Sequence, residues 1–294
     1  MVVPAGAPTE RVRVTEVRPD ATVEREDEAA AEEPLEIRVL TADGPGADRY
    51  RIAVTMRTPG SDFELAVGFL VSEGLLRTPD DVARIAYCTD PGEPQQFNIV
   101  NVQLAPGVTF DAERFRRNVY TTSSCGVCGK AAIEQIATTV ARRPVGGFEV
   151  TPETLGSLPE RIASSQRVFG RTGGLHAAAL FRPNGELISL REDVGRHNAV
   201  DKLVGHRFLA RALPDSNTIL LVTGRAGFEL VQKSAVAGIP FLAAIGAPST
   251  LAIALAREQQ MTLVGFLRAG RFNIYSGPER VGRWPTAAQS TNGA

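Results

Sequence analysis

The amino-acid sequence predicts a three-layer α/β domain with a mixed sheet, preceded by a smaller β-rich α+β domain. From residue 177 onward, a hairpin pattern is followed by helical patterns that alternate with three continuous apolar strands. Continuous apolar strands between helices are typical of a sheet that is covered on both faces. Between residues 34 and 117, short segments of alternating polarity surround one clear helical pattern, which favours a half-exposed sheet.

The first domain is expected over residues 34–117. Ser61 with Glu64 three residues later has the pattern of a capping box, so a helix is predicted from Ser61. Gly74 suits the end of that helix, because glycine adopts the left-handed conformation that often follows a helix. The predicted strands of this domain are 35–39, 50–56, 85–88 and 97–104.

The second domain is expected over residues 151–283, after a segment 118–150 that holds a loop with two cysteines and a helix. Pro183-Asn184-Gly185 is a strong signal for a hairpin turn. The elements predicted in this domain are helix 152–168, strands 177–182 and 186–190, helix 197–213, strand 219–222, helix 229–237, strand 241–245, helix 249–259 and strand 262–267.

Both ends of the chain are predicted to lie outside the domains. Residues 1–33 include an acidic stretch from Glu24 to Glu33 in which alanine fills the gaps, and nothing in it can form a core. We therefore expect a disordered, solvated acidic leader over residues 1–33 and a ragged tail over residues 284–294.

The overall charge and cysteine content narrow the class of protein. Lysine and arginine number 32 and aspartate and glutamate 33, so the net charge of −1 argues against a chain that coats nucleic acid or a membrane surface. The uncharged stretch 234–256 is broken by glycines and prolines, which favours buried α/β core over a membrane span. Three cysteines and no secretory signal indicate a reducing compartment, and we expect the cytoplasm.

Cys125 and Cys128 lie three residues apart in a loop of small residues at the start of a predicted helix. A helix N-terminus and the charge of Lys130 both favour the thiolate, which is the nucleophile in sulfur chemistry. A structural zinc ion would need four ligands, and the sequence has no second CxxC or nearby histidine pair. Thiol chemistry, a metal site and simple packing all remain open for this pair at the level of the residues alone.

Three further segments have the composition of a binding site. Residues 191–202 surround a helix start with charge, which fits either a solvated helix end or the polar wall of a cleft. Gly224 and Arg225 lie in a turn between a strand and a helix, where backbone N–H groups can hold an anion. Residues 266–275 combine arginines with aromatic rings, which suit phosphates and purine or pterin rings, or else form a solvated strand edge.

These segments together resemble the accessory sulfurtransferase family of formate dehydrogenase. The resemblance extends from about residue 34 to residue 282. It rests on Met56-Arg57-Thr58-Pro59-Gly60 with residues 64–70, Cys125-Gly126-Val127-Cys128, Thr172-Gly173-Gly174-Leu175-His176, residues 193–202, Thr223-Gly224-Arg225, and Arg271-Phe272-Asn273-Ile274-Tyr275.

The resemblance implies a sulfur carrier. Such a protein accepts sulfur as a persulfide from a cysteine desulfurase and passes it to the molybdenum of the bis(molybdopterin guanine dinucleotide) cofactor, its bound cargo, before insertion into formate dehydrogenase. Cys125 would carry the persulfide, with Cys128 as its partner. The residues implied at the guanine nucleotide end are Phe266, Leu267, Arg268, Ala269, Gly270 and Arg271, joined by Gly224 and Arg225.

The resemblance also implies the cytidine deaminase fold for the second domain, and a homodimer. The zinc signature of the deaminases, His-x-Glu with Pro-Cys-x-x-Cys, does not occur in the sequence, so neither deamination nor a metal site is expected. Two other functions remain open: a thiol–disulfide oxidoreductase that uses the same CxxC pair, and a non-catalytic protein that binds the molybdopterin guanine dinucleotide. Persulfide formation would separate the carrier from the oxidoreductase.

Overall fold

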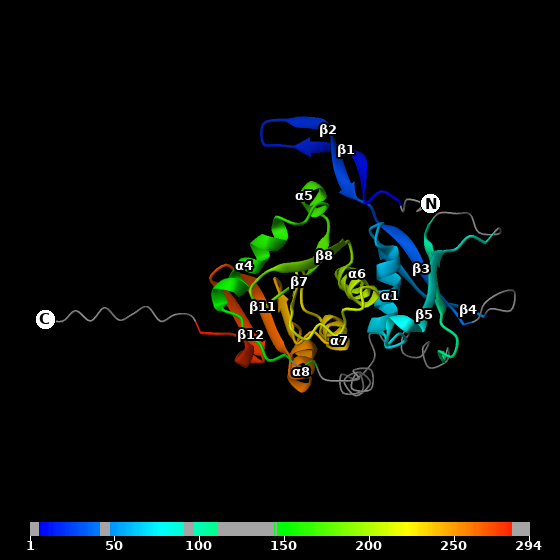
Figure 1. Ribbon diagram of the computed structural model, residues 1–294. Helices are drawn as coiled ribbons and strands as arrows, with labels where there is room; N and C mark the ends of the chain where they lie inside the picture. The colour runs from blue at the N-terminus through cyan, green and yellow to red at the C-terminus, as the bar shows by residue number, and fades with distance from the viewer. Residues whose placement is uncertain (1–5, 42–47, 91–96, 111–143, 145, 284–294) are drawn as a thin grey trace.

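The computed structural model describes residues 6–41, 48–90, 97–110, 144 and 146–283. In this part of the chain, two large sheets enclose a layer of helices, and a separate hairpin extends from the N-terminal side (Figure 1). The mixed α/β fold predicted from the sequence is confirmed. The predicted cysteine loop and the helix after it, in segment 118–150, lie almost wholly outside the described residues.

A six-stranded mixed sheet forms the centre of the second half, with strand order β12-β11-β10-β9-β7-β8. Strands β7 and β8 form the predicted antiparallel hairpin, and β9, β10 and β11 are parallel to one another. Its strands are β7 (His176–Phe181), β8 (Leu187–Asp193), β9 (Ile219–Val222), β10 (Phe241–Ala244), β11 (Thr262–Arg268) and β12 (Arg271–Ser276). Strand β12, which returns antiparallel to β11, was not among the predicted elements.

A four-stranded sheet of order β4-β3-β6-β5 forms the first domain. Strand β3 pairs antiparallel with β4 and parallel with β6, so the sheet is mixed. Its strands are β3 (Glu33–Leu40), β4 (Arg49–Arg57), β5 (Val82–Tyr87) and β6 (Ile99–Leu104). A short 3₁₀ helix, η1 (Pro79–Asp81), leads into β5.

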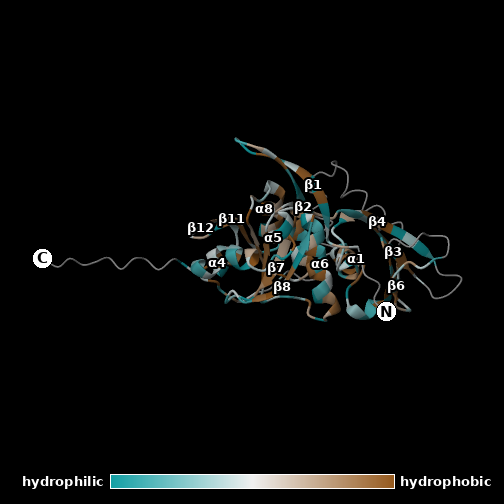
Figure 2. Cartoon of the chain, turned by 90° about the horizontal axis from the view of Figure 1, so that it is seen from above, coloured by the Kyte–Doolittle hydropathy of each residue, from teal (hydrophilic) through white to brown (hydrophobic). Residues whose placement is uncertain are grey.

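The helices divide between the two faces of the six-stranded sheet. Helix α4 packs on one face, whereas α6, α7 and α8 cover the other, and α1 lies between α6 and the four-stranded sheet (Figure 1). Hydrophobic residues gather where these layers meet (Figure 2). The helices are α1 (Asp62–Ser72), α4 (Pro152–Ala163), α5 (Phe169–Thr172), α6 (Arg196–Leu209), α7 (Phe228–Val236), α8 (Thr250–Glu258) and the 3₁₀ helix η2 (Pro278–Arg280).

Helices α1 and α6 pack with their backbones almost in contact, at one glycine from each helix. A Cβ atom on Gly68 would lie 1.8 Å from the carbonyl oxygen of Asp201, and one on Gly205 would lie 1.8 Å from the carbonyl oxygen of Glu64. No side chain fits at such a distance, so glycine is required at both positions. The crossing joins the two predicted domains, and one hydrophobic core runs through both.

The expected disordered leader is wrong for residues 9–30. They form an antiparallel hairpin of β1 (Thr9–Val17) and β2 (Thr22–Ala30). The register sets Arg11 opposite Glu28 and Arg13 opposite Glu26, so the acidic stretch finds its counter-charges on the preceding strand. The prediction failed because it weighed the acidic residues without the arginines that pair with them.

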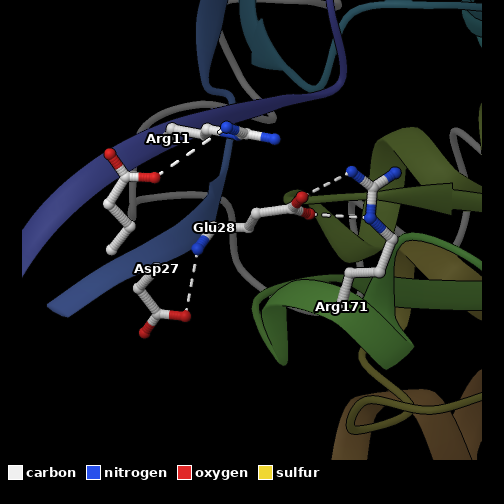
Figure 3. Close-up of a pocket in the computed structure, with 5 residues that line it drawn as sticks. Arg11, Asp27, Glu28 and Arg171 are labelled. Carbon is white, nitrogen blue, oxygen red and sulfur yellow. Dashed lines mark hydrogen bonds and ion pairs between the residues drawn. The ribbon is translucent and has the colours of Figure 1, made fainter.

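The hairpin is held to the body by an ion pair between Glu28 and Arg171 of α5, with Nε 2.7 Å from the carboxylate (Figure 3). Arg11 and Asp27 line the open hollow beside this ion pair. At the base of the hairpin, the side chain of Ala30 lies against Gly174, in the segment that leads into β7.

Helix α1 begins and ends where the sequence predicts, but its cap differs. Ser61 is the N-cap residue, yet it has a left-handed backbone and its side chain makes no capping hydrogen bond. Glu64 instead binds Arg191 on β8, with the Nε of Arg191 2.6 Å from the carboxylate, so the predicted capping box is wrong. Gly74, with a φ of 75°, follows the helix as expected. Among the described residues, no helix is both long and apolar enough to cross a membrane.

The glycine crossing can be tested with Gly68→Ala. We expect the free energy of unfolding to fall by about 3 kcal/mol or more, the upper end of the cost of overpacking, because the new methyl group must push the helices apart. Urea denaturation followed by circular dichroism measures the loss. Gly170→Ala is the matched control, since that glycine of α5 has nothing within 4 Å of its Cβ position. A loss below about 1 kcal/mol for Gly68→Ala would contradict the close packing.

Candidate functional site

Most of the predicted binding residues meet at one edge of the six-stranded sheet, where the parallel strands β9, β10 and β11 end. Gly224 and Arg225 follow β9, residues 245–249 follow β10, and Phe266 to Arg271 end β11 and turn into β12. Ligands in open α/β sheets bind outside the carboxyl ends of the strands. Cys125 and Cys128 lie outside the described residues, so their role stays a prediction.

Backbone hydrogen bonds hold the three turns together. The N–H of Gly246 donates to the carbonyl of Gly224 at 3.0 Å, and the N–H of Phe266 donates to the carbonyl of Gly246 at 3.1 Å. A Cβ on Gly246 would lie 2.9 Å from the Gly224 oxygen, so this contact also needs a glycine. The turns therefore form one continuous rim along the sheet edge.

The β11–β12 turn presents most of the predicted nucleotide residues to solvent. Phe266 is 41% exposed and has a φ of 54°, which turns its side chain away from the core. Arg268 donates from Nη1 to the carbonyl oxygens of Ile245 and Leu267, at 2.8 and 2.7 Å, so its side chain lies across the rim. Ala269, Gly270 and Arg271 are exposed.

Leu267 is a correction to the predicted set. Its side chain is fully buried and belongs to the core between α4 and the six-stranded sheet. Side chains alternate across a strand, so a residue next to the exposed Phe266 faces the opposite side. Leu267 offers a ligand only its backbone.

The β8–α6 turn lies beside the rim and is built on a buried ion pair. Asp193 is fully buried, and its Oδ2 lies 2.7 Å from the Nζ of Lys202. The other oxygen, Oδ1, accepts from the N–H of Gly195 at 2.8 Å and from Asn198 Nδ2 at 3.1 Å. Of the two interpretations of residues 191–202, a simple solvated helix end therefore does not fit Asp193 and Lys202.

The same ion pair fastens the first domain to the second. Lys202 Nζ donates to the carbonyl of Thr58 at 2.8 Å, and the N–H of Thr58 donates to Asp193 at 3.2 Å. Asn198 Nδ2 donates to the carbonyl of Met56 at 2.7 Å. Two segments of the resemblance, 56–60 and 193–202, are thus one interlocked unit, which we call the clamp.

The Thr172–His176 segment reaches the rim from the other side of β9. His176 lies opposite Asp193 in the β7–β8 register, and the N–H of Ala177 donates to Thr223 Oγ1 at 2.9 Å. Burial lowers the pKa of His176 below its ordinary value, and the charges of Arg196 and His197 lower it further, while Asp193 opposes them. His176 is therefore neutral near pH 7.

The rim is electropositive in character. Helices α6, α7 and α8 all begin there, so their unpaired N–H groups face it. Side chains of Arg196, Arg225, Arg268 and Arg271 add charge. His197 Nε2 lies 3.0 Å from the carboxylate of Glu229 at the start of α7, a contact that is an ion pair only when the imidazole is protonated. Such an edge suits a ligand with phosphate groups.

The described residues contain no group of three or more histidine, cysteine, aspartate and glutamate side chains arranged to hold a metal ion. Arg196, His176 and Asn198 belong to motifs of the sequence but were not among the predicted site residues. Their positions depend on which turns the sheet brings together, and the local sequence does not show this.

Residues 30–282 match the FdhD/NarQ family. The chain belongs to this family. A relative from Streptomyces avermitilis, named sulfur carrier protein FdhD, is 52% identical over 290 residues, covering 97% of this chain and 99% of the relative. A relative of the same name from Mycobacterium tuberculosis is 45% identical over 283 residues, covering 94% of this chain and 99% of the relative.

A crystal structure described as a formate dehydrogenase accessory protein, from Desulfotalea psychrophila, has the same fold. Its TM-score is 0.69 at 25% sequence identity, and the match covers 93% of this chain and 99% of that one. The resemblance stated from the sequence motifs is confirmed. The likeness to cytidine deaminases stays a prediction.

The clamp can be tested with Lys202→Met, which keeps the length of the side chain and removes its charge. We expect a loss of about 3–5 kcal/mol in the free energy of unfolding, because Asp193 would be left buried without its partner. Chemical denaturation measures this loss. Arg182→Gln is the control: it breaks an exposed ion pair with Glu186, and such pairs contribute about 1 kcal/mol or less. If Lys202→Met behaves like the control, the clamp does not hold the two domains together.

Proposed function

We propose that this protein is a sulfur carrier that serves the maturation of formate dehydrogenase. The observation that carries the proposal is membership of the FdhD/NarQ family over residues 30–282, with relatives at 43–54% identity named sulfur carrier proteins. The chain itself has the chemistry that such a role needs, since Cys125 and Cys128 form a CxxC pair. The rim at the edge of the six-stranded sheet gives the cargo a place to bind.

Sulfur enters as a persulfide in this proposal. The thiolate of Cys125 attacks the terminal sulfur of a persulfide on a cysteine desulfurase, and the sulfur–sulfur bond of the donor breaks. The donor cysteine leaves as a thiolate, and Cys125 holds the new persulfide. Nothing is oxidised or reduced overall in this exchange, because one sulfur atom moves between two thiolates.

Delivery of the sulfur as sulfide needs two electrons. Cys128 supplies them when its thiolate attacks the inner sulfur of the Cys125 persulfide, forming a Cys125–Cys128 disulfide and releasing sulfide to the molybdenum centre of the cargo. A thiol reductant then restores the pair. This second role gives a reason for two cysteines where one would suffice to carry sulfur.

The cargo in this proposal is the bis(molybdopterin guanine dinucleotide) form of the molybdenum cofactor. Its nucleotide ends carry phosphates, which suit the arginines and helix N-termini of the rim, and a purine, which suits the exposed ring of Phe266. A cofactor with two nucleotide ends fits a homodimer with two equivalent rims. We place the protein in the cytoplasm, where cysteines stay reduced.

Cys125→Ala tests the carrier role. We expect the folded variant to take up no persulfide and cells that contain only this variant to have no formate dehydrogenase activity, because the receiving thiolate is gone. Mass spectrometry after incubation with a cysteine desulfurase and cysteine detects the added sulfur. Cys88→Ala is the control, since Cys88 is buried in the first domain.

Cys128→Ala distinguishes the roles of the two thiols. This variant should load Cys125 but release sulfide slowly, so that the persulfide accumulates. Full enzyme activity in cells with only Cys125→Ala would refute the carrier proposal. Persulfide found on Cys128 and absent from Cys125 would mean that the two roles are reversed. A disulfide that cycles with thiol substrates, without persulfide, would favour the oxidoreductase.

The nucleotide proposal is tested by replacing Arg268 and Arg271 together with alanine. Isothermal calorimetry should show weaker binding of guanosine diphosphate, by roughly tenfold or more given the strength of charge-assisted hydrogen bonds. Little change is expected in melting temperature, since both side chains are exposed. The wild type should bind two nucleotides per dimer. Unchanged affinity would move the site to the Gly224–Gly227 turn.

A further inference from the structure

The N-terminal hairpin projects from the body of the protein and leaves one strand edge open (Figures 1 and 2). Strand β2 packs against α5, to which Glu28 is joined by Arg171, whereas β1 pairs with β2 alone in the part of the chain that the structure describes. An open edge presents unpaired N–H and C=O groups that another strand can bind. A two-stranded hairpin is only marginally stable in water, and further strands stabilise it.

The hairpin also carries valines at its surface. Val17, at the end of β1, is 77% exposed, and Val23 on β2 is 44% exposed. The register sets Val23 opposite Glu16. Val23 therefore lies on the same face of the hairpin as Val12 and Val14, because side chains alternate along a strand. One face is thus partly apolar, and a wider sheet would bury more of it.

A second copy of β1 fits this open edge in one register. In a two-fold antiparallel pair, residues directly opposite each other lie on the same face of the sheet, so the axis passes through one residue. With Val14 on the axis, no like charges oppose each other, and like charges are what destabilises such a pair. The facing pairs between the two copies are Arg13 with Thr15, Val12 with Glu16, and Arg11 with Val17.

Other registers of comparable length bring like charges together. With Arg13 on the axis, the two copies of this arginine meet, and Glu10 faces Glu16 of the second copy. With Val12 on the axis, Arg11 faces Arg13 of the second copy. Self-pairing of β2 is worse, because every register that spans most of the strand opposes acidic residues. These residues are Glu24, Glu26, Asp27 and Glu28.

We propose that β1 pairs antiparallel with β1 of a second copy of this chain, with Val14 on the two-fold axis. The four strands then form one sheet of order β2-β1-β1-β2, and the valines of both hairpins share one face. The contact is isologous, so it closes after two copies. It rests on the homodimer of the proposed function. Because the family match begins at residue 30, this contact adds to any that the matched region makes.

A symmetric disulfide tests the register. Val14→Cys, in a chain with Cys125→Ala and Cys128→Ala, should form a disulfide-linked dimer under mild oxidation, because residues directly opposite in an antiparallel pair have Cα atoms about 4.5–5.5 Å apart. Val12→Cys in the same background is the matched control. Its two copies would lie about 13 Å apart along the strands, too far for a disulfide. Non-reducing gel electrophoresis measures the linked fraction.

Thr15→Arg separates the dimer contact from the hairpin itself. Thr15 lies opposite Glu24 in its own hairpin, so arginine there supports the hairpin. In the dimer it would face Arg13 of the second copy at two places, and the dimer dissociation constant should rise about tenfold by sedimentation equilibrium. Adding Arg13→Glu restores opposite charges and should recover the dimer. Thr22→Arg, on β2 and away from the axis, should behave like the wild type.

Three results would overturn this interface: a wild-type chain that sediments as a monomer, Val14→Cys that links no more than Val12→Cys, or a Thr15→Arg dimer within twofold of the wild-type affinity. Persulfide loading on Cys125 is measured separately, by mass spectrometry on the chain with its native cysteines. Failure of the carrier proposal and failure of this interface are therefore distinguishable.

Discussion

The close crossing of α1 and α6 is the contact on which the rest of the structure depends. At Gly68 and Gly205 the two helix backbones approach until no side chain fits between them. Because the two helices approach so closely, one layer of helices covers both sheets, with α6 packed on the six-stranded sheet and α1 on the four-stranded one. The crossing therefore turns two separate sheets into one layered body with a shared core.

Buried charges then define how the two halves are placed. The Asp193–Lys202 pair also binds both backbone groups of Thr58, so the turn before α1 cannot shift without leaving charges unpaired. A second buried ion pair joins α6 to α7, with Nζ of Lys233 2.7 Å from Oδ1 of Asp201. Buried ion pairs add little net stability, but breaking one is expensive. Their effect here is to fix geometry close to the rim.

The rim differs from the clamp in that its charged side chains are exposed to solvent. The clamp pairs its buried charges, whereas the rim exposes Arg225, Arg268 and Arg271 beside the starts of three helices. Exposed arginines beside helix N-termini suit an anionic ligand. In the proposed carrier, the phosphates of the cargo would neutralise the exposed arginines of the rim.

The sequence alone determined the layered α/β class, the alternation of strands and helices, and the motifs that place the chain in its family. These depend on local periodicity, turn chemistry and residue type, which the sequence shows directly. Only the tertiary structure decided that the acidic leader is a strand paired with its own arginines, that Leu267 faces the core, and that Asp193 and Lys202 clamp the turn before α1. Each of these depends on contacts between residues far apart in the chain or on opposite faces of a strand. Local patterns do not show which partner a charge will meet, so such contacts appear only when the sheets and helices are assembled.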